Sequence, residues 1–152
     1  MTETILTFDD GHHRVKKKIQ INQIHIIAVI SISWTIIGKI VKQIPCYVQN
    51  LDISQNVVVS LDKTSLRDLR VISLVQLNAS SNYISVIDEE AFLGHSKLQT
   101  VDRSSNSLNI IEPKSCIHIP SLETLSLFSN QDLILPEDGP SLYSKSLRVL
   151  NL

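Results

Sequence analysis

The residues able to do chemistry are scattered along this chain and form no catalytic or metal-binding pattern. Cys46 and Cys116 lie too far apart in sequence for the close cysteine pairs that hold zinc. His12 and His13 are adjacent, but two ligands in an extended segment fall short of the set that a metal ion requires. The glycine-rich phosphate loops, nucleophile elbows and zinc-binding helices of common enzymes do not occur. We therefore expect no enzyme activity, no cofactor and no metal.

Composition narrows the classes of protein further. The chain has 152 residues, of which 43% are hydrophobic and 19% are charged, and such a composition can bury a core rather than stay disordered. The formal net charge is -1, so the chain as a whole has no basic field that would gather nucleic acid. We expect a folded chain that does not bind nucleic acid.

Asparagine is the polar residue that recurs regularly. Asn82, Asn106 and Asn130 are spaced by 24 residues, and each follows a leucine-rich run, in LVQLNASSNYI, LQTVDRSSNSL and LETLSLFSNQDL. Asn56 takes the same place in VQNLDISQNVV, and SLRVLNL near the end opens a further copy. The period predicts about four repeats and the start of a fifth over residues 45–152, which makes the repeat the unit of the fold.

Strand alternation assigns each repeat an inner and an outer set of side chains. One repeat cannot bury its own apolar face, so the copies must stack. Stacking forms a buried column of aliphatic side chains: Leu51, Leu77, Val101, Leu125 and Leu150. A second column contains the asparagines Asn56, Asn82, Asn106 and Asn130. We interpret these four as structural residues that bond backbone groups at the turn, because a buried amide must be satisfied.

These blocks resemble the leucine-rich repeat family, with its L-x-x-L-x-L-x-x-N-x-L pattern. The resemblance implies an α/β solenoid, with a curved parallel sheet on the concave side and irregular or short helical segments on the convex side. The repeat length is similar to that of animal extracellular members such as Toll-type receptors and Slit-like proteins, and the last blocks resemble insect ectodomain repeats. The resemblance to this family also implies a non-catalytic module that binds a protein.

The outward positions of the predicted strands are the candidate binding residues. They are Asp52, Gln76, Asn78, Thr100, Asp102, Thr124, Ser126 and Phe128. This concave face is polar with a slight acidic tilt, and Phe128 is its one large apolar side chain, of the kind that dominates interface energies. We expect a basic or amphipathic protein surface as the partner.

Several positions depart from the repeat pattern. Arg103 occupies an inward slot, where a guanidinium is costly unless it is paired; we expect its head to reach water or its repeat to be loosened. Cys116 takes the place of Phe92 and is predicted to be a buried thiol that forms no bridge with Cys46. His95 lies on the convex turn, and we place His118 similarly.

The first residues do not follow the repeat. Residues 1–18 are predicted to form a mobile tail that ends in a basic cluster, and residues 19–41 are hydrophobic. A basic segment followed by an apolar one is typical of a secretory signal or a membrane anchor. Residues 30–36 also alternate between apolar and hydroxyl side chains, which favours a strand that caps the first repeat. Both interpretations remain open at this point, as does possible membrane attachment through residues 19–41.

One motif bears on localisation. Asn78 begins an N-x-S sequon, and a glycan at this outward position would have room. With the basic-apolar start, it favours an extracellular or cell-surface receptor or adhesion protein. The alternatives are a cytosolic scaffold or regulatory subunit, and a receptor fragment without a function of its own. We expect a fragment of a longer array because Leu152 falls inside a predicted strand without a polar capping repeat.

Overall fold

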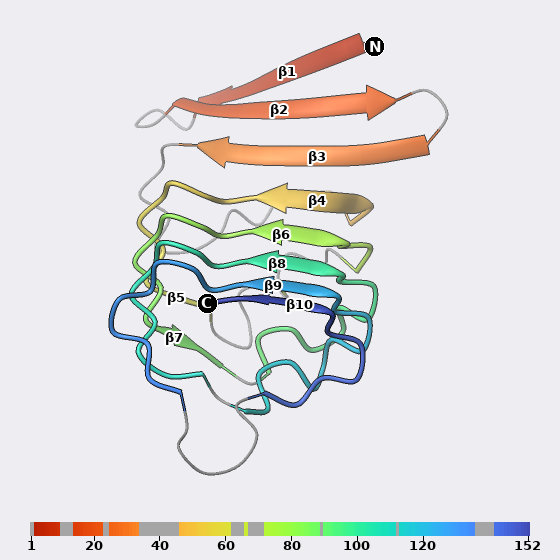
Figure 1. Cartoon of the computed structure of the whole chain (residues 1–152). Helices are drawn as coiled ribbons and strands as arrows, with labels where there is room; N and C mark the ends of the chain where they lie inside the picture. The colour runs from red at the N-terminus through yellow and green to blue at the C-terminus, as the bar shows by residue number, and fades with distance from the viewer. Residues whose placement is uncertain are drawn as a thin grey trace.

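The computed structural model describes residues 2–9, 14–22, 25–33, 46–61, 66, 72–88, 90–111, 113–135 and 142–152, and strands are the only regular elements in these ranges. The strands are β1 (Thr2–Asp9), β2 (Arg14–Asn22), β3 (His25–Ser33), β4 (Val48–Asp52), β5 (Ser60–Leu61), β6 (Gln76–Asn78), β7 (Val86–Ile87), β8 (Thr100–Asp102), β9 (Thr124–Ser126) and β10 (Val149–Asn151). An eight-stranded sheet has the order β1-β2-β3-β4-β6-β8-β9-β10, and β5 pairs with β7 in a second sheet (Figure 1).

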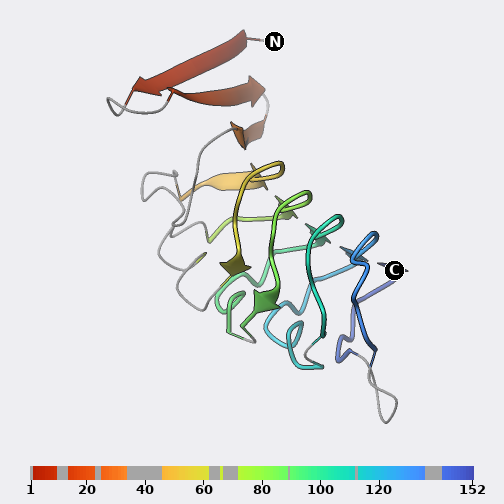
Figure 2. The ribbon, with the colours of Figure 1, turned by 90° about the vertical axis from the view of Figure 1, so that its left-hand side faces the viewer.

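Strands β4, β6, β8, β9 and β10 are parallel and pair without a register shift. β4, β6, β8 and β9 are each followed by a return segment on the other side of the stack, where β5 pairs with β7 and Ile110 bridges to Ile134. Figure 2 shows the successive turns stacked in chain order. The sequence prediction of a parallel-strand solenoid is therefore confirmed.

The core is the column of inward side chains between the strands and the return segments. Leu51, Leu77, Val101 and Leu125 are each about 1% exposed. Leu150 does not share this environment: the sequence places it in the same buried column, but it is 40% exposed. The prediction was wrong for Leu150 because β10 is the edge strand of the sheet and packs against a neighbouring strand, β9, on one side only.

The asparagines tie adjacent turns together. Asn82 donates its Nδ2 to the carbonyl of Ala79 in its own turn at 3.1 Å and to that of Ile53 in the preceding turn at 3.0 Å. Its Oδ1 accepts a hydrogen bond from the Val58 amide at 3.1 Å. Asn106 and Asn130 make the corresponding bonds one and two turns further on. A buried amide with its donors and acceptor satisfied joins the turns without a desolvation penalty.

The residue before each asparagine of the column, Asn56, Asn82, Asn106 and Asn130, has a left-handed backbone. Gln55, Ser81, Ser105 and Ser129 have φ values between 52° and 58°. This conformation costs a non-glycine residue about 1–2 kcal/mol, so the tight turn that aims each asparagine inward is made at a local energetic cost. This turn has no clear signal in the sequence, because serine and glutamine carry no strong preference for positive φ.

The N-terminal strands extend the main sheet. β1 pairs with β2 and β2 with β3 in antiparallel fashion, and β3 pairs in parallel with β4. Strands thus occupy most of residues 1–18, the segment predicted as a mobile tail. The end of β2 and all of β3 lie within residues 19–41, and β3 lies beside β4, where a capping strand is expected. The rest of that hydrophobic segment, residues 23–24 and 34–41, lies outside the described ranges. Among the described residues no helix is long and apolar enough to cross a membrane. The roles of residues 19–41 as signal or anchor stay predictions.

Candidate protein-binding face

The outward side chains of the parallel strands form two straight rows, which we call the strand face. Pairing aligns one row along Asn50, Gln76, Thr100, Thr124 and Val149, and a second row along Asp52, Asn78, Asp102, Ser126 and Asn151. In β8 and β9 the central residue is buried and its two neighbours are half-exposed, as alternation requires. The structure therefore brings seven of the eight predicted binding residues onto these two rows.

The second row is held in place by short local hydrogen bonds. Oδ1 of Asp52 accepts a bond from the Ser54 amide, and Oδ1 of Asp102 accepts one from the Ser104 amide, both at 2.9 Å. Asn78 plays the same part, because its Oδ1 accepts bonds from the Ser80 amide at 3.1 Å and the Ser80 hydroxyl at 2.7 Å. Each carboxylate thus has one oxygen fixed by a backbone amide, and its other oxygen accepts no hydrogen bond from a described residue.

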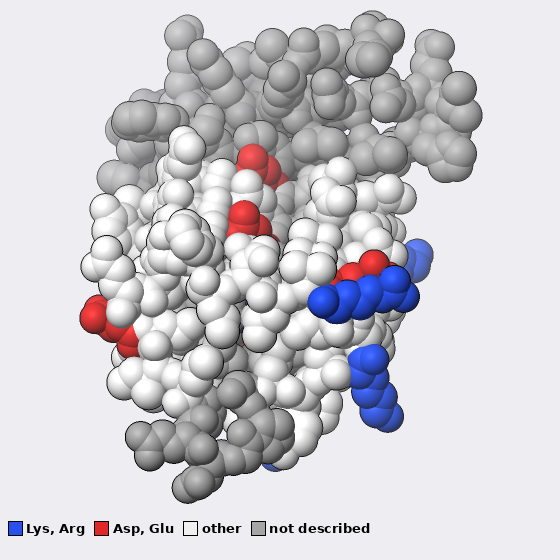
Figure 3. Space-filling model, in the orientation of Figure 1, with Lys and Arg blue, Asp and Glu red and all other residues white. Residues whose placement is uncertain are grey.

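The strand face carries negative charge and no positive charge on β4, β6, β8 and β9. Asp52 and Asp102 lie in one row with β6 between them, so their strands are about 9–10 Å apart. Figure 3 shows acidic side chains in the upper middle of this face, with uncharged residues below and beside them. Such an arrangement attracts ammonium or guanidinium groups and accepts their hydrogen bonds.

Phe128 lies just beyond β9 at one end of the strand face. Its side chain is 60% exposed. It borders an open hollow of about 540 Å³ that is also lined by Ser104, Ser126, Leu150, Asn151 and Leu152. Leu150 and Leu152 are themselves 40% and 55% exposed, so Phe128 belongs to an apolar patch rather than standing alone. The sequence identified Phe128 but not its neighbours.

Arg103 is buried beneath the strand face. It is 3% exposed, its Nε has no hydrogen-bond partner, and its guanidinium lies 6.0 Å from the centre of the Phe92 ring. Neither sequence expectation holds: the head does not reach water, and the turn is not loosened, since the Arg103 amide donates to the Ser126 carbonyl at 2.8 Å. Burial lowers the pKa of Arg103 to about 10, which leaves it charged at neutral pH.

Cys116 and His95 are also buried on the return side. Cys116 is 2% exposed, as its place in the repeat predicts, and burial raises the pKa of its thiol; neither it nor exposed Cys46 forms a disulfide. His95 is 3% exposed, whereas His118 is half-exposed, so the expected similarity of the two was wrong. Backbone hydrogen bonds show why, because Ile119 takes the position in its turn that His95 takes one turn earlier.

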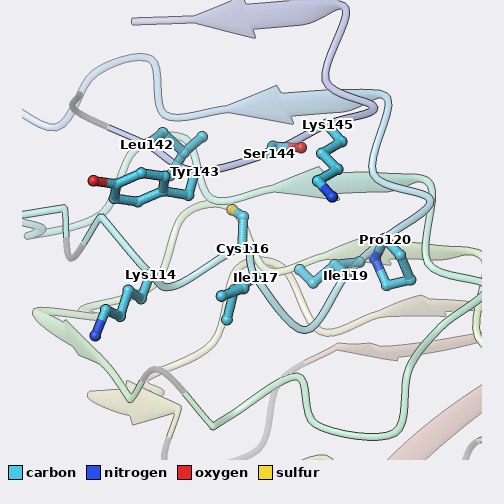
Figure 4. A pocket seen from close by; sticks show the side chains of 9 residues that line it. All are labelled: Lys114, Cys116, Ile117, Ile119, Pro120, Leu142, Tyr143, Ser144 and Lys145. Atoms are coloured by element: carbon cyan, nitrogen blue, oxygen red, sulfur yellow. The ribbon is translucent and has the colours of Figure 1, made fainter.

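A second hollow opens on the return side, away from the strand face. It has a volume of about 640 Å³ and lies between the segment around Cys116 and the segment Leu142–Lys145 (Figure 4). Its lining is mostly apolar, with Lys114, Tyr143, Ser144 and Lys145 as the polar exceptions that could contact a ligand. The amide of Tyr143 donates to the Pro113 carbonyl at 2.8 Å, which holds the two segments together. No sequence pattern predicts this hollow, because residues almost thirty positions apart build it.

Residues 72–131 match a family model described as leucine rich repeat. This part of the chain is therefore similar to leucine-rich repeats, and the described residues form a parallel-strand solenoid. The matched residues include β6 and β8 with their return segments, and β9 with the turn that contains Asn130. Leucine-rich repeats are in general non-catalytic modules that bind proteins. No curated protein matches the chain. Within the described ranges, no three histidine, cysteine or acidic side chains gather as a metal site would require.

Proposed function

We propose that these leucine-rich repeats bind a basic or amphipathic protein through the strand face. The observation that carries the proposal is the row holding Asp52 and Asp102, which ends near the exposed ring of Phe128. Carboxylates give orientation and fast association with a cationic partner, and an aromatic anchor gives binding energy. The outward side chains are free for this role because the core is built from the inward ones.

The acidic row is tested with a displayed library of random peptides selected on the wild-type protein. Selected sequences are expected to be rich in lysine and arginine. The double variant Asp52→Asn/Asp102→Asn should weaken the best peptide about tenfold, or about 1.4 kcal/mol, and should reduce the salt dependence of binding. Glu90→Gln/Asp132→Asn removes the same charge from exposed positions outside the strand face and is the matched control. An equal or larger loss in this control contradicts the proposal.

We further propose that the protein works outside the cell or at its surface, with Asn78 glycosylated. The Asn78 side chain uses its oxygen to hold Ser80, and its Nδ2, the atom that carries a glycan, makes no hydrogen bond to the described residues. Expression in animal cells should give a form whose mobility shifts on glycosidase treatment. The shift should disappear in both Asn78→Gln and Ser80→Ala and persist in Asn50→Gln. A single unshifted cytosolic band favours the cytosolic scaffold instead.

The two proposals constrain each other. Asn78 lies in the same row as Asp52 and Asp102, directly between them. A glycan at Asn78 would therefore cover the acidic part of the strand face and leave the Phe128 end open. We expect the glycosylated protein to bind the selected basic peptide more weakly than the Asn78→Gln variant, with both forms keeping contacts at Phe128. Equal affinities of the glycosylated protein and Asn78→Gln would show that the peptide does not bind at Asp52 and Asp102.

A further inference from the structure

Arg103 carries a buried positive charge, and no acidic side chain among the described residues forms a salt bridge with it. Its Nε is shielded from solvent and has no hydrogen-bond partner. The Phe92 ring, 6.0 Å away, offsets part of the cost through its π electrons. A buried charge normally requires a counter-charge or neutralisation, so a charge of opposite sign is missing from this site.

A second unsatisfied polar group lies on the same small cavity. Ser115 is 2% exposed, and its buried Oγ has no oxygen or nitrogen partner; only the neighbouring Cys116 thiol, a weak acceptor, interacts with it, and this interaction acts to lower the pKa of that thiol. Arg103 and Ser115 line a cavity of about 10 Å³ together with four aliphatic side chains, Ile87, Leu108, Ile110 and Ile111. A space of this size is of the order that holds one atom-sized ligand such as a single water molecule. Two unsatisfied donors thus meet one small space with apolar walls.

We propose that this cavity binds one monatomic anion, chloride, between Nε–H of Arg103 and Oγ–H of Ser115. Both groups donate hydrogen bonds, and an anion supplies the acceptor and the negative charge together. A water molecule in the same place would satisfy the hydrogen bonds but leave the charge uncompensated. The small volume favours a monatomic anion over sulfate or phosphate.

The surroundings suit an exchangeable anion. Ile110 is 57% exposed, so one wall of the cavity faces the solvent from which an ion enters. The Cys116 thiol, which also feels the Arg103 charge, does not serve as the counter-ion, because burial raises its pKa above the ordinary 9.0 and keeps it neutral at pH 7. Arg103 itself stays charged at that pH, and the attraction therefore persists.

The proposal is tested by unfolding the full chain in sodium chloride, sodium bromide and sodium gluconate at constant ionic strength. Binding to the native state stabilises it in proportion to ligand occupancy. Arg103→Leu should have a higher free energy of unfolding than wild type in gluconate. This difference in free energy should become smaller, along a saturating curve, as chloride or bromide replaces gluconate. Arg148→Leu, which removes an exposed arginine, should keep a constant difference from wild type.

Two further measurements keep the proposal falsifiable if Arg103→Leu folds poorly. Ser115→Ala should lose most of the chloride-dependent stabilisation, because it removes the second donor. Crystals grown in bromide should give an anomalous peak beside Arg103 Nε. The proposal is overturned if the wild-type response to chloride is unchanged in Ser115→Ala, or if the cavity holds only water in bromide crystals.

Discussion

The strand face and the return side of this solenoid follow the repeat to different degrees. Beneath the strand face, Leu51, Leu77, Val101 and Leu125 pair in one unbroken register, and the outward side chains beside them in β4, β6, β8 and β9 are polar. On the return side, Phe92 is replaced by Cys116 one turn later, and His95 by Ile119. The strand face is therefore regular, whereas the return side differs from turn to turn.

The irregular positions compensate one another in size. In the turn that contains β6, a small inward residue, Ala79, accompanies the large Phe92; in the next turn, the long Arg103 accompanies the small Cys116. Arg103 reaches back over the Phe92 ring, so the two turns share one packed layer. These pairs of side chains match in volume but not in polarity, because Nε of Arg103 has no hydrogen-bond partner. We therefore expect substitutions on the return side to change stability more than substitutions on the strand face do.

The largest expected effect is on the return side. Phe92→Ala should lower the free energy of unfolding by about 3–5 kcal/mol, because it removes a fully buried ring and leaves a cavity. Cys116→Ala, the matched change one turn later, should cost only about 1 kcal/mol, since a thiol is a small group. Denaturant unfolding measures both. Equal costs would show that the two turns are packed alike and would remove this part of the comparison.

Loss of a linking asparagine ranks next. Asn82→Ala should cost about 1–3 kcal/mol, because it leaves the buried Val58 amide without its acceptor; the Ile53 carbonyl keeps the hydrogen bond from Asn56 Nδ2. Asn78→Ala, a change of the same type on the strand face, should cost less than about 1 kcal/mol. The comparison is made at equilibrium in urea. It fails if the outward asparagine proves as costly as the buried one.

A smaller effect, dependent on pH, is expected at His95. Burial lowers the pKa of His95 from its ordinary 6.5, although backbone hydrogen bonds to Phe92 and Leu93 oppose the shift. The unfolded chain therefore binds a proton first as pH falls. The stability due to neutral His95 is fully present above pH 6.5 and is lost as pH falls from 6.5 toward the lower folded pKa.

The test is to replace His95 with isoleucine, the residue that the next turn uses at this position. His95→Ile should remove the part of the acid sensitivity that arises below pH 6.5, and the midpoint of thermal unfolding at pH 7.5 and 5.5 reports it. His118→Asn is the control and should leave the acid sensitivity in place. An unchanged pH profile in His95→Ile would show that another group titrates.

The smallest expected effect is in the turn that joins the two sides. Ser105→Gly should stabilise the protein by about 0.5–1 kcal/mol, because glycine adopts the positive φ of 52° without strain. Ser107→Gly should instead destabilise it slightly, since Ser107 is not at positive φ. Thermal unfolding of the pair decides the sign. A loss of stability in Ser105→Gly would show that the serine side chain outweighs the strain.

The sequence predicted the parts of this molecule that depend on periodicity. A fixed step between asparagines predicts stacked parallel strands, and alternation within each block places Leu77 inward and Asp102 outward. Features formed by contacts between turns had no such signal: the orphaned Ser115 beside Arg103 and the hollow at Phe128 arise from residues more than ten positions apart. The prediction that Leu150 is buried was wrong for a related reason, because a residue in the column is buried only when its strand has a neighbouring strand on both sides.

The most direct test of the proposed binding face compares one residue from each side. Phe128→Ala should weaken the library-selected peptide by about 1–3 kcal/mol, or roughly 5- to 150-fold in Kd, with an unchanged unfolding midpoint. Lys97→Ala, at an exposed position on the return side, should leave Kd within about twofold of wild type. If Lys97→Ala weakens binding more than Phe128→Ala does, or if Phe128→Ala unfolds the protein, the strand face is not the binding surface.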